Sequence, residues 1–219
     1  MRNFSIEEIV KATGGTLVSG DMEYRVSGLS TDSRKVKEND IFFPLRGENT
    51  DGHNYLGQVI DAGCKTIIFS DKSKLPEKYA SGGEEINLIM VENTTLALQQ
   101  LSQYYLDMLH IKKKIAVTGS VGKTSTRDMT YFVSKVKYKT GRNPKNFNNY
   151  FGLPLTVLDF SEDIEIAVLE MGMASKGEIE TLAHIVKPEI AIITNVGVSH
   201  IENLGSRQGI LEEIGRAHV

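Results

Sequence analysis

The segment TGSVGKTST (118–126) carries the strongest chemical signal in the sequence. Its glycines let backbone N–H groups close around phosphate oxygens, and a following helix adds the positive end of its dipole. Lys123 can reach the β- and γ-phosphates of a nucleotide, and the Thr124 hydroxyl suits Mg²⁺. The spacing is G-x-x-G-K-T, since Val117 stands where the usual G-x-x-x-x-G-K-[ST] loop has its first Gly. We interpret the segment as a nucleotide-phosphate site; an ordinary strand-to-helix turn is the alternative.

Three further polar segments could complete such a site. Glu170 ends an apolar strand, where a carboxylate can hold Mg²⁺ directly or through water, although an exposed strand-end acid is the plainer interpretation. Residues 143–158 have four Asn within seven positions, which offer donors and acceptors to a nucleotide but are also common turn residues. His200 follows TNVGVS, and a lone loop histidine is more often a surface residue than a ligand.

The elements around these residues predict a parallel sheet. Near-continuous Ile, Val and Ala runs alternate with helices that begin near Lys123 and Ser175, as is typical of a doubly wound sheet buried on both faces; the runs are 115–119, 165–171 and 189–195. In this fold class ligands bind beyond the carboxyl ends of the strands. Gly119, Glu170 and Asn195 lie at such ends, so we expect them to converge on one crevice.

The first 110 residues predict a separate, small α/β domain. Ser5 and Glu8 have the capping-box spacing at the start of the first helix. The expected elements are helices 5–13 and 54–62 and strands 24–30, 41–45, 66–70 and 86–91. An amphipathic helix over 93–109 ends at the basic HIKKK, where the pattern changes. We therefore divide the chain into an N-terminal domain, 1–110, and a P-loop domain, 111–219.

The composition is that of a globular protein. Of the 219 residues, 40% are hydrophobic and 24% charged, which excludes a disordered or collagen-like chain. The longest apolar runs, such as IAVLEM, fall far below the roughly 18 residues of a membrane helix, and MRNFSIEEIV lacks the apolar core of a secretory signal. The single cysteine, Cys64, cannot form an internal disulfide. We expect a cytoplasmic protein without a membrane span, in which Cys64 is a core residue.

Basic residues are concentrated around the phosphate loop. Residues 112–145 carry 10 Lys and Arg against the single acid Asp128, whereas residues 1–110 carry 11 against 16 acids. Such an excess indicates either an anion site or a solvated basic helix face. Aromatic residues are not interleaved with these lysines as stacking platforms for bases would require, so we expect no nucleic-acid partner.

Taken together, the segments resemble the Mur ligases of peptidoglycan synthesis. TGSVGKTST resembles the short phosphate loop of the family, NFNNYFGLPLT its Asn-Gly-Pro segment, VLEMGMASKGEIETL its metal-binding Glu region and TNVGVSHIENLGS its Asn/His segment. LSTDSRKVKENDIFFPLRGENTDGHNY is similar to the UDP-sugar-binding domain of the family. The resemblance covers residues 1 to about 211, and the combination is far more specific than any single motif.

The resemblance implies an ATP- and Mg²⁺-dependent ligase and suggests roles for individual residues. The implied catalytic residues are Lys123, Glu170 and His200, and the implied metal ligands are Thr124, Glu170 and His200. The residues expected to bind ATP are Gly119, Ser120, Val121, Gly122, Lys123, Thr124, Ser125 and Asn149. The UDP-sugar would meet Ser33, Arg34, Asp51, Gly52 and His53, for which ordinary turns are the alternative.

Within the family, EMGMASKGEI and SHIENLGS resemble the members that add D-alanyl-D-alanine. Such ligases transfer the ATP γ-phosphoryl group to the terminal carboxylate of UDP-N-acetylmuramoyl-tripeptide, and the amine of D-alanyl-D-alanine then attacks the acyl phosphate. The alternatives are a diaminopimelate- or lysine-adding relative and a nucleotide- or UDP-sugar-binding module without catalysis. A P-loop kinase or GTPase is disfavoured, because no segment resembles N-K-x-D and the first domain would be unexplained. We expect a monomer.

The last residues depart from the family pattern. Mur ligases place a carbamylated lysine about 14 residues after the His, and that position is Ile214 here. The final IGRAHV is also what a common sequencing adapter encodes in one frame. We therefore expect residues 214–219 to be non-native, the P-loop domain to be truncated, and the fragment to be inactive alone.

Overall fold

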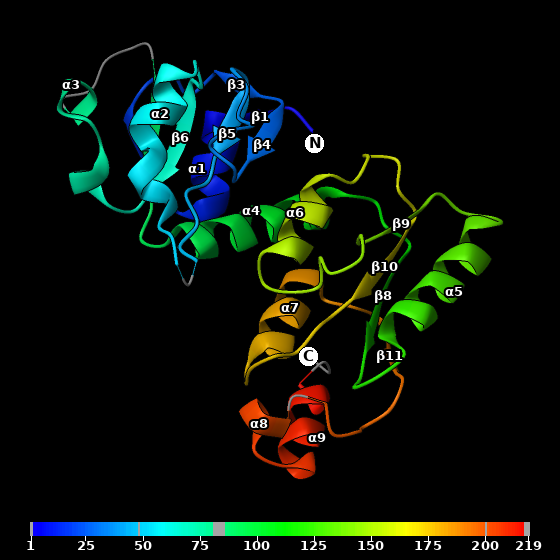
Figure 1. The fold of residues 1–219 in the computed structure, drawn as a ribbon. Helices are drawn as coiled ribbons and strands as arrows, with labels where there is room; N and C mark the ends of the chain where they lie inside the picture. Colours follow the sequence, from blue (N-terminus) through cyan, green and yellow to red (C-terminus); the bar gives the residue numbers. More distant parts are fainter. Residues whose placement is uncertain (1, 48, 81–85, 200, 217–219) are drawn as a thin grey trace. The chain divides into compact units, whose positions relative to one another are not determined.

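The computed structural model describes residues 2–47, 49–80, 86–199 and 201–216. The chain divides into two compact units, Met1–Leu101 and Ser102–Val219 (Figure 1). Helix α4 (Thr94–Met108) begins in the first unit and ends in the second. Each unit is built on a main sheet of its own.

The first unit is built on a five-stranded sheet with the strand order β2-β7-β6-β5-β4. Strands β4 to β7 run parallel, and β2 pairs antiparallel with β7. The strands are β2 (Thr16–Ser19), β4 (Gly28–Ser30), β5 (Asp40–Phe42), β6 (Thr66–Phe69) and β7 (Asn87–Met90). A separate two-stranded ladder pairs β1 (Phe4–Ser5) with β3 (Arg25–Val26). The helical elements are α1 (Ile6–Thr13), η1 (Gly52–Tyr55), α2 (Leu56–Asp61), η2 (Lys72–Lys74) and α3 (Glu77–Ala80).

The first helix forms for the local reason that the sequence predicts. Ser5 Oγ accepts a hydrogen bond from Glu8 N at 3.2 Å, and the Glu8 carboxylate accepts one from Ser5 N at 2.9 Å. This capping box satisfies N–H groups that the helix start would otherwise leave open. Ile6 and Ile9 lie on one face of α1 and are fully buried. The predicted helix start is therefore confirmed.

Apolar side chains of α2 pack against one face of the first sheet. Alternation along the strands turns every second residue toward this face. The cluster consists of Phe42, Leu56, Val59, Ile60, Cys64, Ile67, Phe69, Leu75 and Leu88. Cys64 lies inside it with 1% of its surface exposed, which agrees with the expected core position.

The second unit contains a four-stranded sheet with the strand order β11-β8-β10-β9, in which every neighbouring pair is parallel. The strands are β8 (Lys113–Thr118), β9 (Thr140–Arg142), β10 (Ile166–Glu170) and β11 (Ile190–Ile193). Helix α5 packs against β8, β9 and β10, and Figure 1 shows α7 on the other side of these strands. All five residues of β10 are buried, as expected for a strand covered on both faces. The helices are α5 (Lys123–Lys135), α6 (Gly152–Leu158), α7 (Glu178–Val186), α8 (Ile201–Leu204) and α9 (Arg207–Gly215).

The predicted fold class, a small α/β domain followed by a mostly parallel doubly wound sheet, is confirmed, with local differences. The expected strand 24–30 is two strands, because β3 pairs with β1 and β4 pairs with β5. The helix expected from Ser175 begins at Glu178, since Gly177 has a left-handed φ of +87°. The short strand β9 and helix α6 were not expected; β9 reads TGR and has no apolar signal.

Membrane spans are absent from the part of the chain that the structure describes. No helix there is both long and apolar enough to cross a bilayer. The longest, α4, has 15 residues, fewer than the roughly 20 that a spanning helix needs.

The Cys64 thiol should react slowly in the folded chain. Burial raises its pKa to about 11, and the buried side chain also excludes reagents. Since the thiolate is the nucleophile, about one thiol in a thousand would be ionised at pH 8. We expect iodoacetamide to alkylate Cys64 at least tenfold more slowly in buffer than in urea, as measured by mass spectrometry. Equal rates in the two conditions would contradict the buried position.

Candidate functional site

The phosphate loop lies at the carboxyl end of β8 and leads directly into α5. Gly119 and Gly122 have left-handed φ values of +127° and +85°, and Gly122 is the N-cap of α5. A Cβ at Gly119 would lie 2.3 Å from Thr194 Oγ1 and 2.9 Å from Asn195 O. Glycine at 119 is therefore required by both the backbone conformation and the close approach of the strand-end segment after β11.

The Lys123 side chain folds back over the loop. Its Nζ donates to Gly119 O at 2.7 Å and to Ser120 O at 3.3 Å. Burial lowers the pKa of the Lys123 amino group below its ordinary value, and the nearby Glu170 carboxylate opposes this shift in part. The cation thus sits at the mouth of the loop, where the first residues of α5 leave their N–H groups open to an anion.

Glu170 is a buried carboxylate at the carboxyl end of β10, with only 3% of its surface exposed. Thr124 Oγ1 donates to its Oε2 at 2.9 Å, and Asn148 Nδ2 donates to its Oε1 at 2.8 Å. Arg127 Nη1 lies 3.3 Å from Oε2. Each carboxylate oxygen therefore has a polar partner, which offsets the cost of burying the charge.

Arg127 connects Glu170 to a second acid. Arg127 is 2% exposed; its Nε donates to Asp128 Oδ1 at 2.8 Å, and its Nη2 lies 2.6 Å from the same oxygen. Asp128 also pairs with Arg142 at the end of β9. Burial would raise the pKa of Asp128, but the hydrogen bonds from the two arginines outweigh it and lower the pKa. This network was not predicted, because in the sequence Arg127 is one member of a basic stretch.

The Asn-rich segment folds around the end of β10. Asn143 is fully buried; its Oδ1 accepts from Glu170 N at 2.8 Å and its Nδ2 donates to Glu170 O at 2.9 Å. Asn149 Oδ1 accepts from Gly152 N at 2.8 Å and from Phe151 N at 3.2 Å, at the start of α6. The predicted Asn149 therefore lies near the site with its oxygen engaged in the chain, whereas Asn143 and Asn148 hold Glu170 in place.

The other loop residues predicted to bind ATP differ in exposure to solvent. Ser120 is 6% exposed, and its Oγ accepts from Gly197 N at 2.9 Å. Val121 and Ser125 are exposed. The structure thus brings the loop, Glu170 and Asn195 to the carboxyl edge of the sheet, as the strand ends led us to expect, and Asn148 of the Asn segment bonds Glu170 there. His200 lies outside the described residues.

Two oxygen groups of the kind that could ligate a magnesium ion lie next to each other. The Thr124 hydroxyl and the Glu170 carboxylate are 2.9 Å apart at the loop. Among the residues that the structure describes, no group of three or more His, Cys, Asp or Glu side chains could hold a metal alone. Mg²⁺ characteristically takes one or two protein oxygens and completes its shell with phosphate oxygens and water. The donor set therefore fits a Mg²⁺ ion that arrives with a nucleotide.

In the first unit, an exposed arginine follows β4. Arg34 Nε and Nη2 donate to Asp32 Oδ1 and Oδ2 at 2.8 and 2.9 Å, and 79% of the arginine side chain is exposed. These bonds hold the pKa of Asp32 well below its ordinary value. The same hydrogen bonds to Asp32 raise the pKa of Arg34 above its ordinary value. Ser33 lies half-buried in the same turn.

Asp51, Gly52 and His53 form a second, tightly bonded turn after β5. Asp51 Oδ1 lies 2.7 Å from His53 Nδ1, and His53 Nε2 accepts from Ser70 N at 3.1 Å. Nδ1 must then carry the proton that is donated to Asp51. A Cβ at Gly52 would lie 2.7 Å from Pro44 Cα. His53 is 1% exposed with both ring nitrogens engaged, so it shapes this sheet edge from within.

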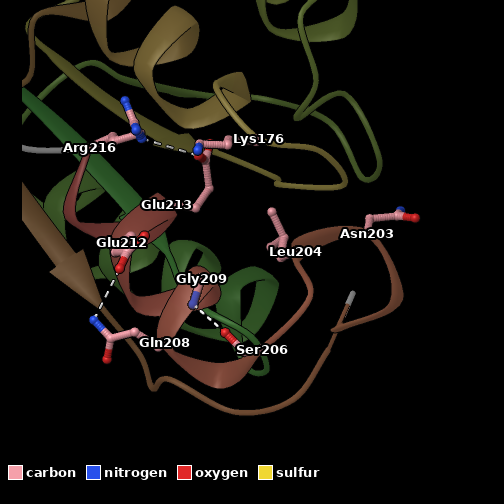
Figure 2. Close-up of a pocket in the computed structure, with 9 residues that line it drawn as sticks. All are labelled: Lys176, Asn203, Leu204, Ser206, Gln208, Gly209, Glu212, Glu213 and Arg216. Carbon is pink, nitrogen blue, oxygen red and sulfur yellow. Dashed lines mark hydrogen bonds and ion pairs between the residues drawn. The ribbon is translucent and has the colours of Figure 1, made fainter.

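A cavity of about 260 Å³ lies beside α9 (Figure 2). Next to it, Glu213 is 1% exposed and accepts from Gly177 N at 2.9 Å and Ile179 N at 3.0 Å. A carboxylate there is favourable because it meets the positive end of the α7 dipole. Since the chain's own carboxylate fills this helix end, we assign no ligand to the cavity.

The fold and the site define a class: an α/β protein whose parallel sheet carries a phosphate loop, a buried strand-end carboxylate and a preceding small α/β unit. Two family models match, "Mur ligase family, catalytic domain" over residues 25–105 and "Mur ligase middle domain" over residues 117–216. The chain belongs to the Mur ligase family.

Individual relatives agree with this assignment. UDP-N-acetylmuramoyl-tripeptide–D-alanyl-D-alanine ligase of Bacillus subtilis is 44% identical over 211 residues, which cover 95% of this chain and 44% of that protein. The Treponema pallidum ligase of the same name is 34% identical, covering 95% and 46%. The chain spans about half the length of the curated relatives it matches.

Solved structures match both units. A crystal structure of MurF from Acinetobacter baumannii has a TM-score of 0.90 and 31% identity, covering 99% of this chain and 46% of that one. MurF from Thermotoga maritima in complex with ADP has a TM-score of 0.79 and 30% identity, covering 88% and 43%. The fold observed in this chain is therefore that of MurF structures.

Replacing the first loop glycine should cost more stability than replacing the second. Gly119→Ala combines a left-handed φ with a contact of 2.3 Å, and we expect a loss of about 3 kcal/mol. Gly122→Ala is the matched control, because its nearest contact is an ordinary 4.0 Å and only the backbone strain of about 1 kcal/mol applies. Urea unfolding measures both; equal losses would contradict the close approach at Gly119.

Arg127 and Glu170 should be energetically coupled. Arg127→Met leaves a buried carboxylate short of a counter-charge, and we expect a loss of about 3 kcal/mol. In Arg127→Met/Glu170→Gln the loss should be smaller than the sum of the two single losses by about 1–3 kcal/mol. A double-mutant cycle from urea unfolding measures this difference. Strictly additive losses would show that Arg127 and Glu170 do not stabilise each other.

Proposed function

We propose that this chain supplies the UDP-sugar and ATP sites of a ligase that adds D-alanyl-D-alanine to UDP-N-acetylmuramoyl-tripeptide. The observation that carries the proposal is the meeting of Lys123, Thr124 and the buried Glu170 at the carboxyl edge of a parallel sheet. The relatives of that name support the choice of substrates. We further propose that the protein is a cytoplasmic monomer.

The reaction would proceed in two steps. The terminal carboxylate of the tripeptide attacks the γ-phosphorus of ATP, which forms an acyl phosphate and releases ADP. The amine of D-alanyl-D-alanine then attacks the acyl carbon, loses a proton and expels phosphate, which leaves an amide. Covalent attachment to the protein is not needed, so catalysis rests on positioning and charge stabilisation.

The residues of the loop would reduce the electrostatic repulsion between the two negatively charged substrates. Two polyanions must meet, and like charges about 4 Å apart repel by about 4 kcal/mol at an effective dielectric of about 20. Lys123 would leave its two carbonyl partners for the β- and γ-phosphates, and the N-terminus of α5 would face the same oxygens. Thr124 and Glu170 would hold Mg²⁺, which neutralises phosphate charge when bound. His200 remains a proposed further ligand.

In the first unit, the edge formed by the carboxyl ends of β4, β5 and β6 would receive the uridine diphosphate end. Ser33 and the exposed Arg34 follow β4 and would face the ligand. Asp51, Gly52 and His53 follow β5 and are bonded to Ser70 after β6, so they would shape the edge. Adjacent parallel strands bring these three turns to one edge.

Lys123→Ala should weaken nucleotide binding by this chain. The substitution removes the loop cation and leaves the glycines and α5 in place, so we expect the affinity for Mg·ATP to fall at least tenfold by calorimetry. Lys11→Ala, an exposed charge on α1, is the matched control and should bind as the unchanged chain does. Unchanged affinity in Lys123→Ala would contradict the proposal that the phosphate loop binds the nucleotide.

The substrates require an assay of their own. In the full-length protein, phosphate release from ATP should depend on both UDP-N-acetylmuramoyl-tripeptide and D-alanyl-D-alanine. Release that instead requires diaminopimelate or lysine would assign the protein to another branch of the family. Binding of Mg·ATP without any such release would leave a binding module without catalysis.

A further inference from the structure

Asn195, which follows β11, bonds both backbone groups of one phosphate-loop residue. Its Oδ1 accepts from Val121 N at 3.2 Å, and its Nδ2 donates to Val121 O at 3.0 Å. The backbone carbonyl of Asn195 also accepts from Ser120 N at 3.1 Å. Val121 and Asn195 are 74 positions apart in the sequence, so this contact exists only because β11 lies next to β8.

We propose that Asn195 is the positioning residue of the phosphate loop. The inference rests on the proposed nucleotide site and adds a residue to it. Its amide holds the loop in the nucleotide-free chain in the conformation that receives phosphate, and it acts through Val121 without touching the ligand. A consequence is that the N–H of Val121 faces Asn195, so phosphate is received by the N–H groups that begin α5.

Val121 at the tip of the loop needs such a clamp, because the bonds that Lys123 donates within the loop go to Gly119 O and Ser120 O. Gly119 and Gly122 flank Ser120 and Val121, and glycine restricts the backbone least of all residues. The Val121 side chain is 63% exposed and gives the loop tip little packing. Thr194 Oγ1 also donates to Val121 O at 2.6 Å, from the same strand-end segment as Asn195. Fixing the loop before the nucleotide arrives reduces the ordering cost of binding.

The helix start shows which N–H groups remain for an anion. The first intrahelical bond of this region runs from Thr126 N to Gly122 O at 3.0 Å. The N–H groups of residues 123–125 precede it and are those that a helix leaves open at its beginning. Asn195 thus holds the part of the loop that faces β11, while the N–H groups at the start of α5 are left to bind the phosphate.

The side chain at 195 has a chemical requirement. A short planar group must present one acceptor and one donor together, and the asparagine amide does so. Aspartate has the same shape but offers two acceptors, so it would set a carboxylate oxygen against Val121 O. It would also place a negative charge beside the loop that has to receive phosphate. Asn195→Asp is therefore a near-isosteric test, and Asn195→Ala removes both bonds.

The first measurement is hydrogen exchange at the Val121 amide by NMR, in the chain without nucleotide. In Asn195→Ala we expect Val121 to exchange at least tenfold faster, while the β10 amides of residues 166–170 keep their protection. Asn39→Asp is the charge-matched control, because Asn39 is exposed and its Oδ1 accepts from Tyr24, as a carboxylate would also do. It should leave the Val121 rate unchanged.

The second measurement is the affinity for Mg·ATP by calorimetry. We expect at least a tenfold loss in Asn195→Ala and a larger loss in Asn195→Asp, with the difference between the two decreasing at high salt. Asn39→Asp should bind as the unchanged chain does. These losses, together with the local change in exchange, separate a positioning role from general destabilisation, which would also expose β10.

The outcomes distinguish this inference from the proposed function. An unchanged Val121 exchange rate in Asn195→Ala overturns the clamp, whatever the nucleotide does. Faster exchange with unchanged ATP affinity overturns the positioning role. If the unchanged chain does not bind Mg·ATP, the proposed function fails while the exchange result still decides whether Asn195 holds the loop.

Discussion

The site depends on one constraint, the neutralisation of the buried Glu170 carboxylate. A charge with 3% of its surface exposed is tolerated only when each of its oxygens has a polar partner. Thr124, Asn148 and Arg127 supply those partners from α5 and the Asn segment. The same contacts tie the first turn of α5 to the end of β10, so the phosphate loop and the acid are held in one arrangement by one set of bonds.

The strand order explains why distant segments meet there. β8 lies between β10 and β11, and all of these strands run in one direction. Their carboxyl ends therefore place the phosphate loop between Glu170 on one side and Thr194 and Asn195 on the other. The chain order is β8, β9, β10 and β11, so contacts 46 and 74 positions apart arise directly from the topology.

The sequence alone predicted the features that a local pattern encodes. The phosphate loop, the strand-end position of Glu170 and the Ser5 capping box are each written in a few consecutive residues. Arg127 and Asn148 were missed because their roles depend on a partner that only folding provides. A short, half-buried edge strand such as β9, with the sequence TGR, has no apolar signal and is placed by its pairing with β10.

Several basic residues around the loop form ion pairs in the folded structure, which the linear sequence does not show. Lys112 and Lys139 pair with Glu165 and Asp163, and Arg127 and Arg142 pair with Asp128. Acids that follow residue 145 in the chain therefore offset part of an excess that looks unopposed in the linear sequence. Lys123 differs from these four because its partners are two loop carbonyls. Exchanging neutral oxygens for phosphate oxygens strengthens its bonds, whereas a lysine taken from a carboxylate would give up an ion pair. An anion would thus be drawn to the loop and not to the whole stretch.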